Sequence, residues 1–78
     1  MSTTNIVLYS APWCAYCVAL QKKLDQRNIT YEYKNVDEPS VRAEMNKKTE
    51  NNQTIPVLFV GNKYKVNPNE GDLKELLA

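Results

Sequence analysis

The sequence predicts an α/β protein, in which a four-stranded mixed sheet carries helices on both faces. Short β-prone runs alternate with helical patterns in the order β-α-β-α-β-β-α. A helix joins the first two strands and favours parallel pairing, whereas Gly61-Asn62 joins the last two and favours an antiparallel hairpin. A chain of 78 residues is too short for a second core, so we expect one domain over residues 1–78.

The first strand and the first helix lie on either side of Pro12. Ile6 to Tyr9 is a continuous β-prone run, short enough for a strand buried on both faces. Pro12 fixes its own φ angle and turns the chain out of this strand. The pattern from Cys14 to about Arg27 is helical, and Asn28 is expected to end the helix. The predicted apolar face of this helix consists of Cys17, Leu20 and Leu24, with Val18 beside them.

The second strand and the second helix carry weaker apolar patterns. Ile29 to Val36 is predicted to be an edge strand with one buried face and one wet face, because Tyr31 and Tyr33 alternate with Glu32 and Lys34. The segment Asp37-Glu38-Pro39-Ser40 is typical of a helix start. We expect a mostly polar helix from there to about Lys48, with Val41 and Met45 on one face.

The C-terminal third of the chain predicts a hairpin and a last helix. Thr54 to Val60 is strongly β-prone, and Lys63 to Val66 is the expected return strand. The final helix is expected to begin at Asp72, after a loop. Its apolar stripe would consist of Leu73, Leu76 and Leu77.

Charge and hydropathy exclude several classes of partner. Ten basic and nine acidic residues leave a net charge of +1, and the charges are interspersed, which argues against nucleic acid or membrane as partners. No apolar run approaches the ~20 residues that cross a bilayer. Residues 1–5 lack the basic start of a secretory signal, so we expect a cytoplasmic protein. In that reducing compartment a close cysteine pair is more often catalytic or metal-binding than a permanent crosslink.

Cys14 and Cys17 are spaced for thiol–disulfide chemistry. Positions three apart on a helix lie side by side, with Cβ atoms ~5–6 Å apart, so the two sulfurs can bridge with modest adjustment. The loop that they close is tiny, so a disulfide there adds little stability and opens easily. Backbone N–H groups at the helix start favour the thiolate of Cys14, which makes it the nucleophile. Cys17, one turn further, is expected to be more buried and to resolve the mixed disulfide.

Other roles for the cysteines remain open at this point. Two inert core cysteines could coincide at this spacing. A zinc site would need four ligands, and the chain has no histidine and no second C-x-x-C. An iron–sulfur cluster shared between two chains stays possible, with Cys14 as one ligand. Pro56 at a strand start is predicted to follow a trans bond on general frequencies alone.

The arrangement of these motifs resembles the glutaredoxins of the thioredoxin superfamily, from Ile6 to Leu77. The resemblance is carried by Trp13-Cys14-Ala15-Tyr16-Cys17 on a helix and by Thr54-Ile55-Pro56 before a hairpin. It implies a thioredoxin-like fold with strand order 2-1-3-4, one helix on one face of the sheet and two on the other. It also implies a cis Ile55–Pro56 bond beside the cysteines, which reverses the prediction from frequencies. That bond would turn the Ile55 backbone toward an extended substrate.

Departures from the common glutaredoxin pattern point to a branch of the family. Asn67-Pro68 stands where glutathione-using glutaredoxins have Gly-Gly, and Ala15 stands where many have Pro. Both features, together with Trp13 and the stretch 51–56, resemble mycoredoxins, which use mycothiol. Those proteins usually have Arg at the position of Gln53. The C-terminal stretch of redoxins that are recharged by thioredoxin reductase is missing.

The resemblance implies an enzyme that reduces mixed disulfides between proteins and a small thiol, mycothiol or glutathione. Cys14 and Cys17 would be catalytic, and no metal or tightly bound cofactor is expected. The implied partners are disulfide-containing client proteins and an NADPH-linked reductase, and the protein would be a monomer. The alternatives are a disulfide reductase recharged by thioredoxin reductase and an iron–sulfur redox sensor. Residues expected to bind substrate are Trp13, Tyr16, Thr54, Ile55, Pro56, Asn67 and Pro68.

Overall fold

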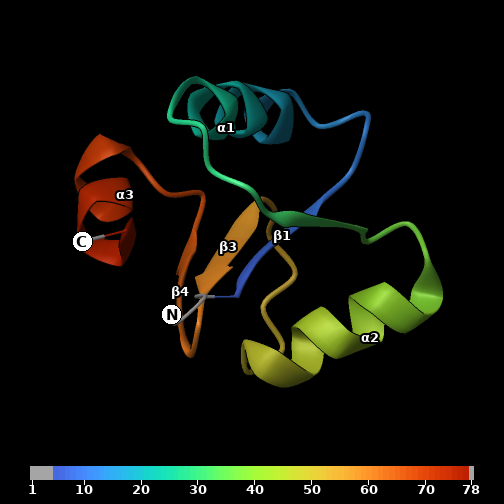
Figure 1. The fold of residues 1–78 in the computed structure, drawn as a ribbon. Helices are drawn as coiled ribbons and strands as arrows, with labels where there is room; N and C mark the ends of the chain where they lie inside the picture. Colours follow the sequence, from blue (N-terminus) through green and yellow to red (C-terminus); the bar gives the residue numbers. More distant parts are fainter. Residues whose placement is uncertain (1–4, 78) are drawn as a thin grey trace.

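The fold has the predicted order of elements, β-α-β-α-β-β-α (Figure 1). A computed structural model describes residues 5–77 of the chain. The strands are β1 (Ile6–Ser10), β2 (Glu32–Asn35), β3 (Val57–Val60) and β4 (Lys63–Val66), and the helices are α1 (Ala15–Gln26), α2 (Pro39–Lys48) and α3 (Glu70–Leu77). Within residues 5–77, no helix is both long and apolar enough to span a bilayer.

The four strands form one mixed sheet in the order β2-β1-β3-β4. β1 and β2 are parallel, and the other two pairs are antiparallel, which confirms the predicted topology. The β1–β2 ladder runs to Ser10 opposite Asn35 and continues as a 2.9 Å bond from Val36 N–H to the Ser10 carbonyl. Because the pair is parallel, the loops that follow β1 and β2 leave the sheet at the same edge.

Different helices cover the two faces of the sheet, one on one side and two on the other. On the first face, Leu8 and Leu58 lie in a buried cluster with leucines of α1 and α3. On the second face, Tyr9 and Val57 share a cluster with Met45 of α2. Figure 1 shows α1 and α2 on opposite sides of the sheet. Successive strand residues point to opposite faces, so the same two central strands supply both clusters.

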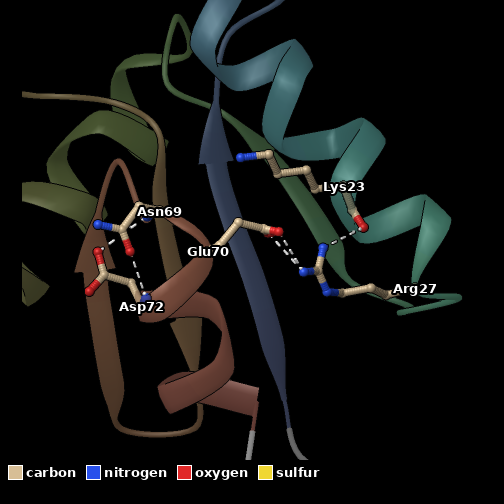
Figure 2. A network of polar contacts seen from close by, with 5 residues as sticks. All are labelled: Lys23, Arg27, Asn69, Glu70 and Asp72. Carbon is tan, nitrogen blue, oxygen red and sulfur yellow. Dashed lines mark hydrogen bonds and ion pairs between the residues drawn. The ribbon is translucent and has the colours of Figure 1, made fainter.

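Polar contacts fasten α1 to α3 (Figure 2). One guanidinium nitrogen of Arg27 lies 2.8 and 2.9 Å from the two carboxylate oxygens of Glu70. A second nitrogen of Arg27 donates to the Lys23 carbonyl at 3.3 Å. Both charged side chains are partly exposed, so this pair contributes about 1 kcal/mol at most. Its effect is to fix where the start of α3 meets the end of α1.

The end of α1 is as predicted, whereas the start of α3 is not. Asn28 has a φ of 57° and, with Ile29, donates to the last free carbonyls of α1, as in a Schellman ending. α3 begins at Glu70 rather than at Asp72, because Asn69 caps it. The Asp72 N–H donates to the Asn69 side chain at 2.8 Å and the Asn69 N–H donates back at 3.2 Å, a reciprocal capping box (Figure 2).

Two strands are shorter than predicted. β2 covers Glu32–Asn35 and not the whole of 29–36, because an edge strand pairs only where its neighbour β1 runs beside it. β3 begins at Val57 and not at Thr54, since Pro56 has no N–H to give to the ladder.

Two large apolar side chains, Tyr33 and Val18, are exposed. Tyr33 pairs with Leu8 in the register of β1 and β2 but is 41% exposed, so the predicted burial of the face that carries Tyr31 and Tyr33 is wrong for Tyr33. Val18 is 39% exposed beside the buried Cys17, Leu20 and Leu24 of α1. The buried stripe of α1 consists of Cys17, Leu20 and Leu24, as predicted, and Val18 lies beside it.

Candidate active site

Cys14 is the N-cap residue of α1. Its extended backbone (φ −92°, ψ 113°) places the sulfur over the first turn, where it accepts a hydrogen bond from the Cys17 N–H at 3.2 Å. The Cys14 carbonyl accepts the first helical bond, from Val18 N–H at 3.0 Å. The sulfur thus occupies the place of the Ser or Asp oxygen at an ordinary helix start. The N–H groups of the first turn have no partner within the helix, and the Cys14 sulfur meets one of them, that of Cys17.

Cys17 lies behind Cys14 and is closed to solvent. Its side chain is 0% exposed, against 7% for Cys14, and both thiols are reduced. Burial raises the pKa of the Cys17 thiol above its usual value, and the neighbouring Cys14 thiol raises it further. The Ser10 hydroxyl and the Ala11 backbone lower it by less. Cys17 is therefore held as a neutral thiol, whereas the sulfur of Cys14 lies nearer the surface.

Ser10 brings a buried hydroxyl to this pair. The residue ends β1 and is 0% exposed, and its oxygen has no hydrogen-bond partner among residues 5–77. It nevertheless lies close enough to the Cys17 sulfur to favour the thiolate. The geometry is not that of a formed hydrogen bond, so the hydroxyl is a donor available to Cys17 when that sulfur ionises.

The Ile55–Pro56 bond is cis and lies in the wall around the cysteines. Ile55 packs against the same buried cluster as Cys14 and Cys17. The cis bond agrees with the expectation from the family resemblance and overturns the prediction from general frequencies. Thr54, just before it, is exposed, and its carbonyl accepts a 2.9 Å bond from the Asn52 side chain.

Asn67 and Pro68 meet this wall from the C-terminal side. The Asn67 N–H donates to the Pro56 carbonyl at 2.7 Å, and Asn67 has a φ of 47°. Asn67 itself is exposed, whereas Pro68 is buried. Of these two predicted residues, Asn67 is thus joined directly to Pro56.

Two aromatic side chains stand on either side of the nucleophile position. Trp13 is 66% exposed and Tyr16 is 70% exposed, although both are large apolar groups. They are next to Cys14 and Cys17 in the chain and leave ring surface open to solvent there. Exposed aromatic surface beside a reactive sulfur is suited to hold a ligand with an apolar side.

Asp37 is a further residue of this site, beyond those predicted from the sequence. The Trp13 indole N–H lies 3.0 Å from each carboxylate oxygen of Asp37. The signal that could have revealed it is the predicted parallel pairing of the first two strands. Trp13 follows the first strand and Asp37 follows the second, so both belong to loops at the same edge of the sheet.

Two cavities lie away from the cysteines. A hollow of about 420 Å³ lies between the β3–β4 hairpin and α3, and one of about 560 Å³ lies beside the start of β1. Neither is lined by a residue of the C-x-x-C segment. Across residues 5–77, no three His, Cys, Asp or Glu side chains are grouped so that they could hold a metal ion.

Comparison with known sequences gives a consistent result. The model of the glutaredoxin family matches residues 6–65. A Mycobacterium tuberculosis protein that is named as a glutaredoxin is 28% identical over 80 residues, which cover 100% of this chain and 95% of that protein. A glutaredoxin of Ricinus communis is 28% identical over 67 residues, which cover 82% of this chain and 66% of that protein.

Solved structures show the same fold. A glutaredoxin from Archaeoglobus fulgidus superposes with a TM-score of 0.84 at 21% identity, covering 97% of this chain and 88% of that one. Buckwheat glutaredoxin in complex with glutathione gives a TM-score of 0.65 at 26% identity, covering 78% of this chain and 58% of that one. The first likeness concerns the fold alone, and it agrees with the sheet order and helix placement described above.

Proposed function

The chain belongs to the glutaredoxin family of thiol–disulfide oxidoreductases, and on that premise we propose that it reduces mixed disulfides between proteins and a small thiol. One observation carries the proposal. The Cys14 sulfur caps α1 near the surface, and the Cys17 thiol is held neutral and buried one turn behind it. This is the division between attacking and resolving thiols that disulfide exchange needs.

The proposed reaction proceeds by two exchanges of a sulfur–sulfur bond. The Cys14 thiolate attacks the small-thiol sulfur of the mixed disulfide, and the client leaves as a thiolate that takes up a proton. The small thiol is now bonded to Cys14. A second molecule of that thiol loses its proton and attacks the sulfur of the small thiol bonded to Cys14. The two small thiols leave joined by a disulfide, and Cys14 leaves the broken bond as a thiolate. Alternatively, Cys17 loses its proton and attacks Cys14, which releases the small thiol and leaves a Cys14–Cys17 disulfide.

The substrate side of the proposal uses the wall around Cys14. The open ring faces of Trp13 and Tyr16 would contact the small thiol on one side. Ile55 and Pro56 would present their backbone to it on the other, and Asn67, bonded to Pro56, would border the same pocket. Thr54 and Pro68 would support these segments rather than contact the sulfur.

Mycothiol is the small thiol that we propose first. The resemblance to mycoredoxins in the Cys14 and Asn67-Pro68 segments supports it, as does the full-length similarity to a mycobacterial protein. Glutathione is the alternative, and a buckwheat family member is known in complex with it. We further propose that the protein is a cytoplasmic monomer. An NADPH-linked reductase would recharge it, because thiol–disulfide exchange of this kind consumes reducing equivalents continuously.

Oxidation of NADPH tests the proposal when the three recharging systems are supplied separately. These are glutathione with its reductase, mycothiol with its reductase, and thioredoxin reductase alone, each with a protein–thiol mixed disulfide as substrate. We expect turnover with a small thiol, fastest with mycothiol, and none in the Cys14→Ser variant. Turnover with thioredoxin reductase alone would instead establish a dithiol reductase of the other class. No turnover in any arm would overturn the proposal.

A further inference from the structure

Trp13 combines high exposure with a fixed polar contact. Its side chain is 66% exposed, yet its one polar atom, Nε1, lies 3.0 Å from both oxygens of Asp37. A hydrogen bond to a carboxylate is stronger than one between neutral groups. Exposed side chains otherwise exchange between rotamers on the ps–ns timescale. The contact therefore restricts a ring that little else in its surroundings would hold.

Asp37 is itself firmly placed. Its backbone N–H donates to the Asn35 side chain at 2.9 Å, which closes an Asx turn at the end of β2. The residue before it, Val36, is fully buried and donates to the Ser10 carbonyl at 2.9 Å. The backbone next to Asp37 is thus hydrogen-bonded to the end of β1. The chain runs from this same end of β1 directly to Trp13. Both partners of the bond are anchored to the same part of the sheet.

We propose that Asp37 is a positioning residue, which holds the Trp13 indole as a preformed surface beside Cys14. This inference rests on the proposed function, because the indole surface has a role only if a mixed disulfide binds at Cys14. A binding partner that must first order a mobile aromatic ring loses part of its affinity to that ordering. Asp37 fixes the ring in the free protein. The small thiol of a mixed disulfide then binds without the cost of ordering the indole.

A second explanation for Asp37 is its charge, which could act on an anionic substrate directly. Asp37→Asn separates the two explanations, because the amide oxygen still accepts from the indole N–H and the charge is removed. Asp37→Ala removes both. Glu38→Ala is the matched control, since it deletes the neighbouring carboxylate, which makes no capping bond to α2. Trp13→Phe keeps a ring and removes only the donor.

The bond is tested by NMR, because Trp13 is the only tryptophan of the chain and its indole N–H gives one cross-peak. In Asp37→Ala we expect that peak to move upfield and to exchange faster with water. In Asp37→Asn and Glu38→Ala it should stay close to its wild-type position and exchange rate. An unchanged indole peak in Asp37→Ala, in a protein whose amide peaks remain dispersed, would overturn the inference.

The positioning role is tested by the KM for a mixed disulfide. We expect Asp37→Ala to raise KM by about two- to tenfold, the equivalent of ordering one large side chain on binding, with kcat within about twofold of wild type. Asp37→Asn should restore the wild-type KM. In the Trp13→Phe background, Asp37→Ala should have no further effect, because the donor is already gone.

The possible failures are distinguishable. A wild-type protein without reductase activity defeats the proposed function. An active wild type with unchanged KM in Asp37→Ala defeats the positioning role, and so does an Asp37→Asn variant as impaired as Asp37→Ala. An equal loss from Asp37→Ala with and without the Trp13 donor shows that Asp37 acts independently of the indole, which also overturns the inference.

Discussion

The backbone N–H of Asn67 donates to the Pro56 carbonyl across 2.7 Å, so the segment before α3 is tied to the cis proline beside the cysteines. Asn67 makes this bond with a φ of 47°, in the left-handed region. Asn tolerates that region better than most residues, and Gly adopts it without strain. The conformation of one exposed residue therefore determines how the loop before α3 is held against Pro56.

Replacing Asn67 is expected to show this conformational requirement. Asn67→Ala should lower the free energy of unfolding by about 1 kcal/mol, because a Cβ without a compensating polar group is disfavoured at positive φ. Asn67→Gly should be within about 0.5 kcal/mol of wild type. Urea denaturation monitored by circular dichroism measures both values. Equal stability of the Ala and Gly variants would contradict the argument.

The two cysteines should differ sharply on substitution. Cys14→Ser should reduce mixed-disulfide reductase activity to the uncatalysed rate, since it removes the attacking sulfur. Serine is itself a favoured N-cap, so this variant should keep the stability of α1. Cys17→Ser should retain activity when a small thiol regenerates the enzyme. Coupled assays on both variants measure this, and full activity of Cys14→Ser would refute the assignment.

Ser10→Ala should shift the pH dependence of the resolving step. Burial raises the pKa of Cys17, and the Ser10 hydroxyl partly offsets that rise by favouring the thiolate. Without the hydroxyl the pKa rises further, so attack of Cys17 on a mixed disulfide at Cys14 should need higher pH. The Cys14 sulfur cannot ionise in that disulfide, so it does not contribute to the pH dependence of this step. Release of the small thiol, followed against pH by rapid quench, measures the shift.

The same variant has an informative effect on stability. Because the Ser10 oxygen is buried and has no hydrogen-bond partner among the residues that the structure describes, Ser10→Ala should not lower the free energy of unfolding. If Ser10→Ala is stable and its pH dependence of small-thiol release is unchanged, the hydroxyl plays no part in the attack of Cys17 on the mixed disulfide.

Glu44 should stabilise the fold in a pH-dependent way. Its carboxylate accepts from the fully buried Tyr9 hydroxyl and from Lys34 Nζ at 2.7 Å. The Lys34 bond, followed by the Tyr9 bond, lowers the pKa of Glu44 below its usual value. Glu44→Ala should cost about 1–3 kcal/mol at neutral pH, because the Tyr9 hydroxyl loses its partner.

The sign of the pH effect follows from the lowered pKa of Glu44. A carboxyl group with a lowered folded pKa stabilises the protein above its unfolded pKa, and that contribution is lost as the pH falls through the folded value. The stability difference between wild type and Glu44→Ala should therefore shrink in acid. Glu75→Ala, which removes a carboxylate 3.0 Å from Lys65 at an exposed position, is the control. It should change stability by less than about 1 kcal/mol throughout.

Local patterns were sufficient to predict the order of the elements and the place of the cysteine pair. Cys14 and Cys17 are close in sequence, and the helix that brings them together is determined by its own residues. The hairpin at Gly61-Asn62 is equally local, and Gly61 has the positive φ of 63° that such a turn needs.

Contacts between distant segments could not be predicted in the same way. Trp13 and Asp37 are 24 positions apart, and Tyr9 and Glu44 are 35 apart. Each pair depends on how strands and helices stack, and on side-chain directions that no short window contains. The exposure of Tyr33 could not be predicted for the same reason, because alternation in an edge strand does not show how far neighbouring elements cover each of its residues.

The sulfur of Cys14 is the proposed nucleophile and also caps α1, so chemistry at this one atom would also act on the helix. In the reduced protein the sulfur accepts from the Cys17 N–H at 3.2 Å. Bonding the Cys14 sulfur to a small thiol turns it into a disulfide sulfur, which is a weaker acceptor, and capping bonds of this kind are worth about 0.5–2 kcal/mol. The redox state is therefore coupled to local opening of the first turn, and the hydrogen-exchange rate of a single amide, that of Cys17, reports it.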